Sequence, residues 1–190
     1  MFRLLLGLTC ILFVQAYQSA TTTLEKEYLQ AAFRNDVEGV QQALAQGVDP
    51  NVRDDRSGQT ALMGSVLRGN DKMVQFLLDR RDVDVVVPEK DGYRPAHGAG
   101  FQGRAQILRL LYAKGIDIGS DMHEDGYLPL HRACWGREPR HAETVRAFHE
   151  LGVNLATPAR DGRTCAEMTG NSKTLEVLKE LGFYAEEAEL

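Results

Sequence analysis

The sequence predicts an all-α solenoid, in which short helix-turn-helix units stack against one another. One observation is a glycine that recurs at steps of 34, 34 and 36 residues: Gly58, Gly92, Gly126 and Gly162. Another is an apolar residue that keeps the 34-residue step in three copies and comes three residues late in the fourth: Val40, Val74, Leu108 and Val145. Because one such unit cannot bury its apolar faces alone, the units have to stack on their nearest neighbours.

Each unit opens with a turn that leads into a short first helix. The dipeptide Asp-Gly recurs at 91–92, 125–126 and 161–162, and glycine there accepts the positive φ of such turns. Pro95 and Pro129 follow three residues after the turn, where the first turn of a helix tolerates a residue without an N–H.

The two helices of a unit differ in their side chains. The first helix carries small residues such as Ala99 and Ala133, which allow neighbouring helices to approach closely, and Gly69 or Gly103 ends it. The second helix carries apolar residues at the i, i+3, i+4 spacing of one buried face. In two of the units these residues are Val74, Leu77 and Leu78, and Ile107, Leu108 and Leu111.

This unit resembles the ankyrin repeat. That family's unit, about 33 residues long, begins with T-P-L-H-x-A, continues as G-h-x-x-x-V-x-x-L-L and closes with G-A-D-V-N. Residues 94–118, RPAHGAGFQGRAQILRLLYAKGIDI, are a close copy, and residues 128–136, LPLHRACWG, repeat the opening. The resemblance covers residues 24 to about 184, and it implies an ankyrin-repeat α-solenoid with protruding β-turn or hairpin loops.

The predicted organisation has a leader, a linker, five repeats and an acidic tail. In order, these are a signal peptide at 1–16 with a second potential cut after residue 20, a linker at 17–23, repeats at about 24–56, 57–90, 91–124, 125–160 and 161–184, and a tail at 185–190. The leader has one positive charge, then the apolar run LLLGLTCILFV, then small residues, which is the order of a secretory signal. Its apolar run is too short to cross a bilayer. We therefore expect a mature N-terminus at Tyr17 or Thr21 and no membrane attachment after cleavage.

The stretch HGAGFQG spells a dinucleotide-binding fingerprint with Gly98, Gly100 and Gly103, and Asp117 follows at a suitable distance. The repeats account for these residues differently. Gly103 separates the two helices of its unit, and Asp117 belongs to the loop that Asp49 occupies in the first repeat. No strand runs directly into Gly98, as the fingerprint requires. We expect no nucleotide cofactor and no other cofactor.

Histidine and cysteine residues raise the question of a chemical site. His97 and His131 occupy the T-P-L-H column, where the resemblance implies hydrogen bonds to the backbone of adjoining turns. A metal site of His131, Cys134, His141 and His149 would require four side chains from different parts of the repeat frame to converge, so no metal is expected. Cys134 and Cys165 lie in adjacent repeats at different heights, and in an oxidising compartment a disulfide between them stays an open alternative.

One column of the repeat is more apolar than the family pattern, in which it is often polar. It contains Phe33, Leu67, Phe101 and Trp135, again at steps of 34 residues. Two tyrosines, Tyr93 and Tyr127, lie just before the first helix of their repeats. These six residues either pack between repeats or form an apolar strip along the concave groove that binds a partner. Aromatic residues are common anchors of protein interfaces.

The function predicted from these observations is that of a monomeric binding module without catalytic residues, which is secreted, lumenal or periplasmic. Its partner would be a protein bound through the concave groove and the turn loops. A net charge of −5 argues against nucleic acid. Two alternatives stay open, an intracellular ankyrin scaffold whose leader is not used and an enzyme whose site is not recognised.

Overall fold

The structure is a computed structural model that describes residues 23–184 of the chain. Within these residues the chain forms helices joined by loops, without a β-strand. The first helical stretch covers 23–33. The helices that follow are α2 (Val37–Ala45), α3 (Ala61–Arg68), α4 (Asp71–Leu78), α5 (Pro95–Phe101), α6 (Ala105–Ala113), α7 (Pro129–Cys134), α8 (Pro139–Glu150), α9 (Cys165–Met168) and α10 (Ser172–Glu180).

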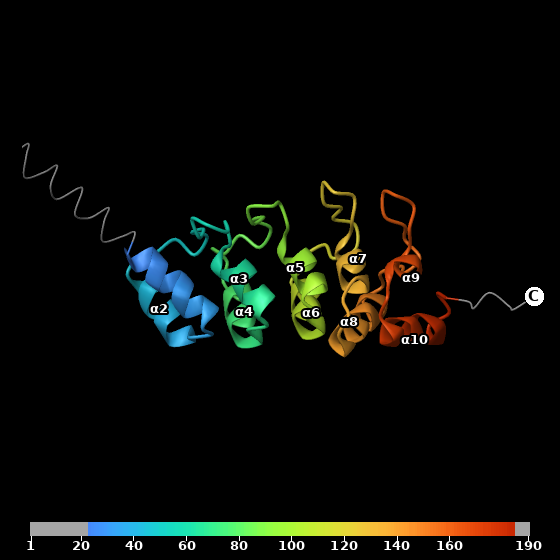
Figure 1. Cartoon of the computed structure of the whole chain (residues 1–190). Coiled ribbons are helices and arrows are strands. Elements are labelled where there is room, and N and C mark those ends of the chain that lie inside the picture. The colour runs from blue at the N-terminus through green and yellow to red at the C-terminus, as the bar shows by residue number, and fades with distance from the viewer. Residues whose placement is uncertain (1–22, 185–190) are drawn as a thin grey trace, which may run out of the picture.

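The helices come in pairs that follow one another along a single row. Figure 1 shows α3 with α4, α5 with α6, α7 with α8 and α9 with α10, and the loops that join the pairs protrude on the same side. The predicted all-α solenoid of stacked units is confirmed. In the described part of the chain, no helix combines the length and the apolar character needed to cross a membrane.

Several helices begin at residues that favour a helix start. Pro95 and Pro129 are the first residues of α5 and α7, as predicted. The hydroxyl of Thr60 accepts a hydrogen bond from the Met63 N–H at 3.2 Å and so caps α3. Pro139, in the three-residue insertion of the fourth repeat, begins α8 in the same way.

The protruding loops are tight turns held by backbone hydrogen bonds. In the loop before α5, the Glu89 N–H donates to the carbonyl of Tyr93 at 2.9 Å, and Gly92 between them has a φ of 88°. The next N–H along, from Lys90, donates to the carbonyl of Ser57 in the preceding loop at 2.9 Å. Neighbouring loops are therefore bonded to each other as well as closed on themselves.

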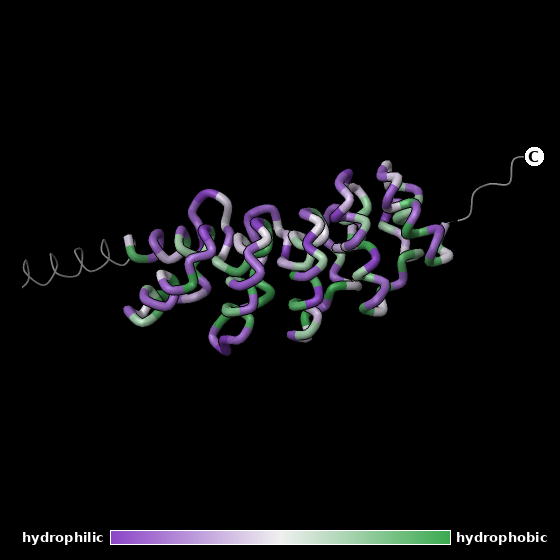
Figure 2. Tube along the Cα trace, turned by 90° about the horizontal axis from the view of Figure 1, so that it is seen from below, coloured by the Kyte–Doolittle hydropathy of each residue, from purple (hydrophilic) through white to green (hydrophobic). Residues whose placement is uncertain are grey.

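The core runs the length of the stack between the helix pairs. The apolar column that revealed the repeat is completely buried in all four copies, at Val40, Val74, Leu108 and Val145. The small residues Ala99 and Ala133 of the first helices are also completely buried. Figure 2 shows hydrophobic and hydrophilic segments that alternate along every pair of helices.

The glycine fingerprint belongs to the packing of the repeats. Gly98 and Gly100 lie within α5, and Gly103 follows its end. A Cβ atom on Gly100 would lie 2.2 Å from the carbonyl oxygen of Pro129, the first residue of α7. Glycine is therefore required there because the next first helix comes so close.

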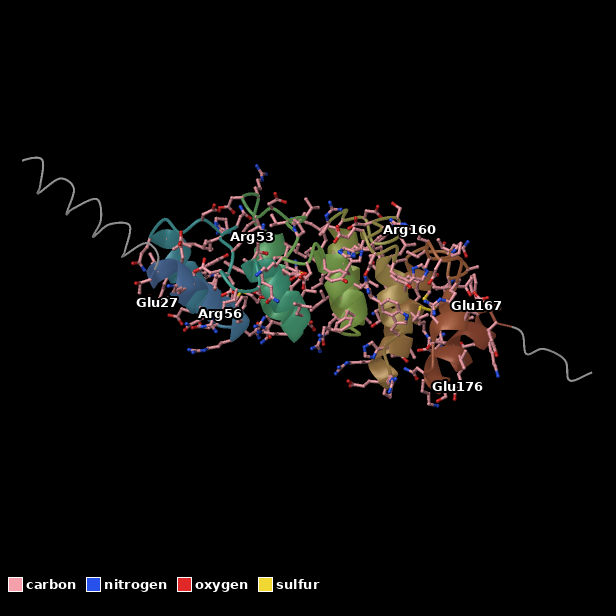
Figure 3. The ribbon with its side chains drawn as sticks, turned by 45° about the horizontal axis from the view of Figure 1, so that its top comes forward. Glu27, Arg53, Arg56, Arg160, Glu167 and Glu176 are labelled. Carbon is pink, nitrogen blue, oxygen red and sulfur yellow. A yellow bond between two sulfur atoms is a disulfide. The ribbon has the colours of Figure 1, made fainter. Side chains whose placement is uncertain are left out.

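A disulfide bond joins Cys134, the last residue of α7, to Cys165, the first residue of α9. Both side chains are completely buried, and Figure 3 shows the bond inside the last helix pairs. The disulfide that the sequence left open is thus formed, although the two residues occupy different positions in their own repeats. The end of one first helix meets the start of the next, so Cys134 and Cys165 take the places that Gly100 and Pro129 hold one repeat earlier.

Candidate partner-binding site

The aromatic column begins with two side chains that fit against glycines of the next repeat. A Cβ atom on Gly64 would lie 2.0 Å from the ring of Phe33, and one on Gly98 would lie 3.1 Å from a methyl carbon of Leu67. Both side chains are half-buried. Phe33 also has the Arg68 guanidinium 4.0 Å from its ring centre. Phe33 and Leu67 thus contribute to packing between repeats, and partner binding by them stays a prediction.

Phe101 differs because the residue that corresponds to Gly64 and Gly98 in the next repeat is Arg132. The niche that holds Phe33 and Leu67 is missing for Phe101, and 57% of its surface is exposed. Few large apolar residues in the described part of the chain are this exposed, and Phe101 lies at the end of α5 beside a pocket.

Arg132 is held in a cage of three aromatic rings. Its guanidinium carbon lies 4.7 Å from the ring centre of Tyr93, 5.4 Å from that of Tyr127 and 4.8 Å from that of Trp135. Contacts of this kind between a cation and an aromatic face are attractive. Tyr127 and Trp135 also contact each other edge to face, with ring centres 4.5 Å apart. Three of the six predicted residues are thus brought together, around a cation that sequence reasoning missed.

The charge of Arg132 is compensated within the same cluster. Its guanidinium forms an ion pair with Asp125 and donates to the Tyr93 hydroxyl at 3.2 Å, and that hydroxyl donates to Asp125 at 3.1 Å. Burial raises the pKa of Asp125, but hydrogen bonds from Arg132 and His123 outweigh it and hold that pKa well below its usual range. Asp125 therefore stays ionised. Its charge neutralises that of Arg132, which is then not available to pair with an acidic ligand.

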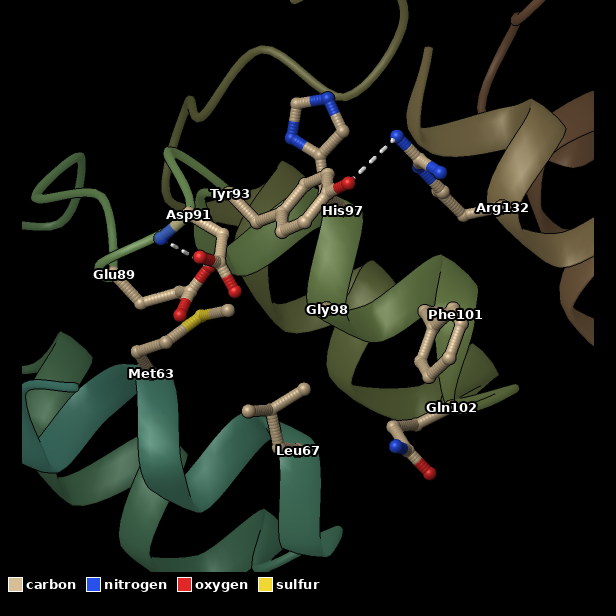
Figure 4. A pocket seen from close by; sticks show the side chains of 10 residues that line it. All are labelled: Met63, Leu67, Glu89, Asp91, Tyr93, His97, Gly98, Phe101, Gln102 and Arg132. Carbon is tan, nitrogen blue, oxygen red and sulfur yellow. Dashed lines mark hydrogen bonds between the residues drawn. The ribbon is translucent and has the colours of Figure 1, made fainter. Parts of the chain in front are cut away.

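A pocket of about 270 Å³ lies between α3 and α5, under the loop that precedes α5. Figure 4 shows its lining, in which apolar side chains occupy the helices and two carboxylates occupy the loop. The residues are Met63, Leu67, Glu89, Asp91, Tyr93, His97, Gly98, Phe101, Gln102 and Arg132. Three of the predicted binding residues, Leu67, Tyr93 and Phe101, meet here, whereas Phe33, Tyr127 and Trp135 do not line this pocket.

His131 makes the hydrogen bonds that the ankyrin resemblance implies. The Leu128 N–H donates to its Nδ1 at 3.1 Å, and its Nε2 lies 3.0 Å from the Thr157 carbonyl oxygen in the following loop. The prediction for His131 is confirmed. His141 makes a similar bridge, with Nε2 3.1 Å from the carbonyl oxygen of Phe101.

His97 differs, because neither of its ring nitrogens makes a hydrogen bond of ordinary geometry, although the backbone of Tyr127 in the adjoining turn lies near the ring. In the loop that follows His97, Asp121 lies five residues before the turn glycine Gly126. In the loop that follows His131, Thr157 lies at the same distance before Gly162. The carboxylate of Asp121 lies 3.7 Å from Nδ1 of His97, whereas the Thr157 carbonyl faces Nε2 of His131, and Arg94 binds the Asp121 carboxylate at 2.5 Å. His97 is only 2% exposed, and burial lowers its pKa to about 4, although Asp121 opposes the shift.

We expect His97 to make the fold less stable as the pH falls from about 6.5 to about 4. In this range the unfolded chain binds a proton at His97 that the folded chain does not bind, so the free energy of unfolding falls with decreasing pH. The decrease is at most about 1.4 kcal/mol per pH unit. Urea unfolding across this range should show it, and His97→Gln should reduce the slope. His131, whose pKa burial also lowers, contributes in the same direction. An unchanged slope in His97→Gln would contradict the assignment.

The side chains of the rejected metal site have other contacts. Cys134 is bonded to Cys165, His131 and His141 bind backbone groups, and the ring of His149 packs against Phe183 with centres 5.5 Å apart. The contacts of Cys134, His131 and His141 occupy the sulfur or nitrogen atoms that a metal ion would need, whereas the contact of His149 is made by the face or edge of its ring.

Comparison with known proteins identifies the repeats. Residues 29–122 match the family model of ankyrin repeats (3 copies). The chain is 37% identical over 178 residues to the mitochondrial disaggregase of Bos taurus, covering 91% of this chain and 25% of that protein. It is 35% identical over 108 residues to alpha-latrotoxin-Lg1a of Latrodectus geometricus and 34% identical over 87 residues to the nuclear factor NF-kappa-B p105 subunit of Gallus gallus. These two matches cover 56% and 46% of this chain and 8% of each relative, so the chain spans a quarter or less of the three relatives.

Proposed function

Because the chain belongs to the ankyrin-repeat family, we propose that it is a non-catalytic binding module of the secretory pathway that recognises a protein partner. Ankyrin repeats generally mediate protein–protein interaction. The proposed contact surface comprises the predicted concave groove, with the pocket between α3 and α5, and the turn loops above it.

The observation that carries this proposal is the exposure of Phe101 at the edge of that pocket. A large aromatic side chain that is 57% exposed beside an apolar hollow is costly to leave in water and provides an anchor for a partner. The other walls, formed by Leu67 and Met63, continue the apolar surface from α5 onto α3.

The Cys134–Cys165 bond supports the secretory compartment. Structural disulfides form and persist in oxidising compartments and are rare in the cytosol. The predicted signal peptide at 1–16 points to the same route, although it lies outside the described residues.

We therefore expect protein isolated from its native source to begin at Tyr17 or Thr21 and to have no free thiol at Cys134 or Cys165. N-terminal sequencing and mass measurement with and without reduction and alkylation would establish both points. Protein that retains Met1 and has both thiols free would instead favour the intracellular alternative.

Affinity capture in the native compartment tests the binding function. The wild-type chain should retain a stoichiometric protein that Phe101→Ala loses. Tyr112→Ala is the matched control, because Tyr112 is 48% exposed but lies on α6, outside the pocket. Equal retention by both variants would exclude the pocket, and turnover of a small molecule by the pure chain would favour the enzyme alternative.

A further inference from the structure

The pocket between α3 and α5 is apolar along the two helices and acidic at the end next to the loop that precedes α5. Leu67 and Phe101 stand at its outer side, and Met63 and Gly98 form its floor. Figure 4 shows the carboxylates of Glu89 and Asp91 above Met63, under the loop that closes the pocket. The Asp91 N–H donates to the Glu89 carboxylate at 3.1 Å, which holds these two residues together.

Neither of these two carboxylates forms an ion pair with a cation in residues 23–184. Glu89 is half-buried, so its charge is partly removed from water without a counter-charge. Arg132 also lines the pocket, but its charge is compensated by Asp125 and enclosed by aromatic rings. The pocket therefore has an excess of negative charge.

His97 also lines this pocket, but its ring points away from the two carboxylates and toward Asp121. It is 2% exposed, and the polar groups near its ring are the Asp121 carboxylate, 3.7 Å from Nδ1, and the backbone of Tyr127. Because burial lowers its pKa to about 4, the ring is neutral at pH 7 and adds no positive charge to the pocket.

We propose that this pocket binds the side chain of a lysine or arginine presented by a protein partner. The apolar stem of that side chain would lie along Leu67, Phe101 and Met63, and its cationic end would pair with Glu89 and Asp91. Long cationic side chains have this division between an apolar stem and a charged end. At about 270 Å³ the pocket lies below the usual range of about 300–1,000 Å³ for drug-sized ligands and suits a single side chain.

The proposal rests on the function proposed above and names the partner's chemistry. It can be tested without the partner, by titrating the whole chain with Nα-acetyl-lysine amide, Nα-acetyl-arginine amide, Nα-acetyl-norleucine amide and Nα-acetyl-glutamate amide. Norleucine has the apolar stem of lysine without its charge. Backbone NMR signals of residues 89–103 and of Arg132 report occupation of the pocket.

We expect the lysine and arginine probes to bind in the millimolar range and roughly fivefold more tightly than norleucine, the scale of two partly exposed ion pairs. Glu89→Gln with Asp91→Asn should abolish this difference. The control is Asp55→Asn with Glu124→Gln, which removes the same charge from the neighbouring loops outside the pocket and should preserve the difference.

Equal binding of lysine and norleucine, a preference for glutamate, or no shift with any probe at millimolar concentration would each overturn the proposal. Its failure can be distinguished from failure of the binding function. If a partner is captured through Phe101 and its binding is unaffected by Glu89→Gln with Asp91→Asn, the groove binds a partner without a cationic anchor. If the cationic probes bind but no partner is captured, the pocket is correct and the proposed function is not.

Discussion

Replacing Cys165 by Ser is expected to lower the free energy of unfolding by about 3 to 4 kcal/mol, the effect of opening a loop of this length. The two cysteines are 31 residues apart, and their bond joins the last two first helices of the stack. The effect should be concentrated at the C-terminal end. Helix α9 is a single turn from Cys165 to Met168, held by this bond and by its packing on α7, whereas α10 is also held by its packing on α8.

Chemical unfolding of the wild type and of Cys165→Ser, each with and without reductant, measures this contribution. Reductant should lower the stability of the wild type to that of the variant and leave the variant unchanged. Hydrogen exchange should then become faster in α10 than in α4, because units of a solenoid depend mainly on their nearest neighbours. Coincident unfolding curves for reduced and oxidised wild type would show that the bond contributes little to the fold.

The fold could be predicted from the sequence because every unit meets the same kind of neighbour. Side chains such as Val74 and Leu108 are buried to the same extent in every repeat, because each repeat packs between similar neighbours. The recurrence of such apolar residues at a fixed step in the sequence therefore reveals the stack. The Pro95 and Pro129 helix starts follow from backbone chemistry that is local to each residue.

Contacts between units were harder to predict because they depend on the offset of one unit against the next. Cys134 and Cys165 occupy different positions in their own repeats, and only the close approach of α7 and α9 brings them together. Gly100 and Pro129 make the equivalent contact between the preceding two repeats. Knowledge of that contact would have predicted that Cys134 and Cys165 meet.

The candidate site departs from the repeat pattern at single residues. His97 resembles His131 in sequence, but its hydrogen bonds depend on whether the following loop offers a backbone carbonyl or the Asp121 side chain. Arg132 replaces the glycine of earlier repeats and leaves Phe101 exposed. The sequence signal that could have found the site is this substitution within the column of Gly64 and Gly98.

Truncating Phe101 to Ala is expected to weaken partner binding by about 2 kcal/mol or more, which is roughly a thirtyfold increase in Kd. The fold should lose less than about 1 kcal/mol, because a largely exposed ring leaves no core cavity. Trp135→Ala should differ. Trp135 is half-buried against Tyr127 and Arg132, so its loss should cost about 1 to 3 kcal/mol of folding stability from the ring and cation contacts.

Thermal melts and binding titrations on the two single variants separate these roles, with Tyr112→Ala as the exposed aromatic control. Phe101→Ala should melt near the wild type yet bind weakly, whereas Trp135→Ala should melt lower. Affinity has to be compared per folded molecule, because unfolding alone reduces apparent binding. A large loss of stability in Phe101→Ala with unchanged affinity of the folded fraction would assign its ring to packing between repeats. The exposed end of α5 would then not be the anchor of an interface.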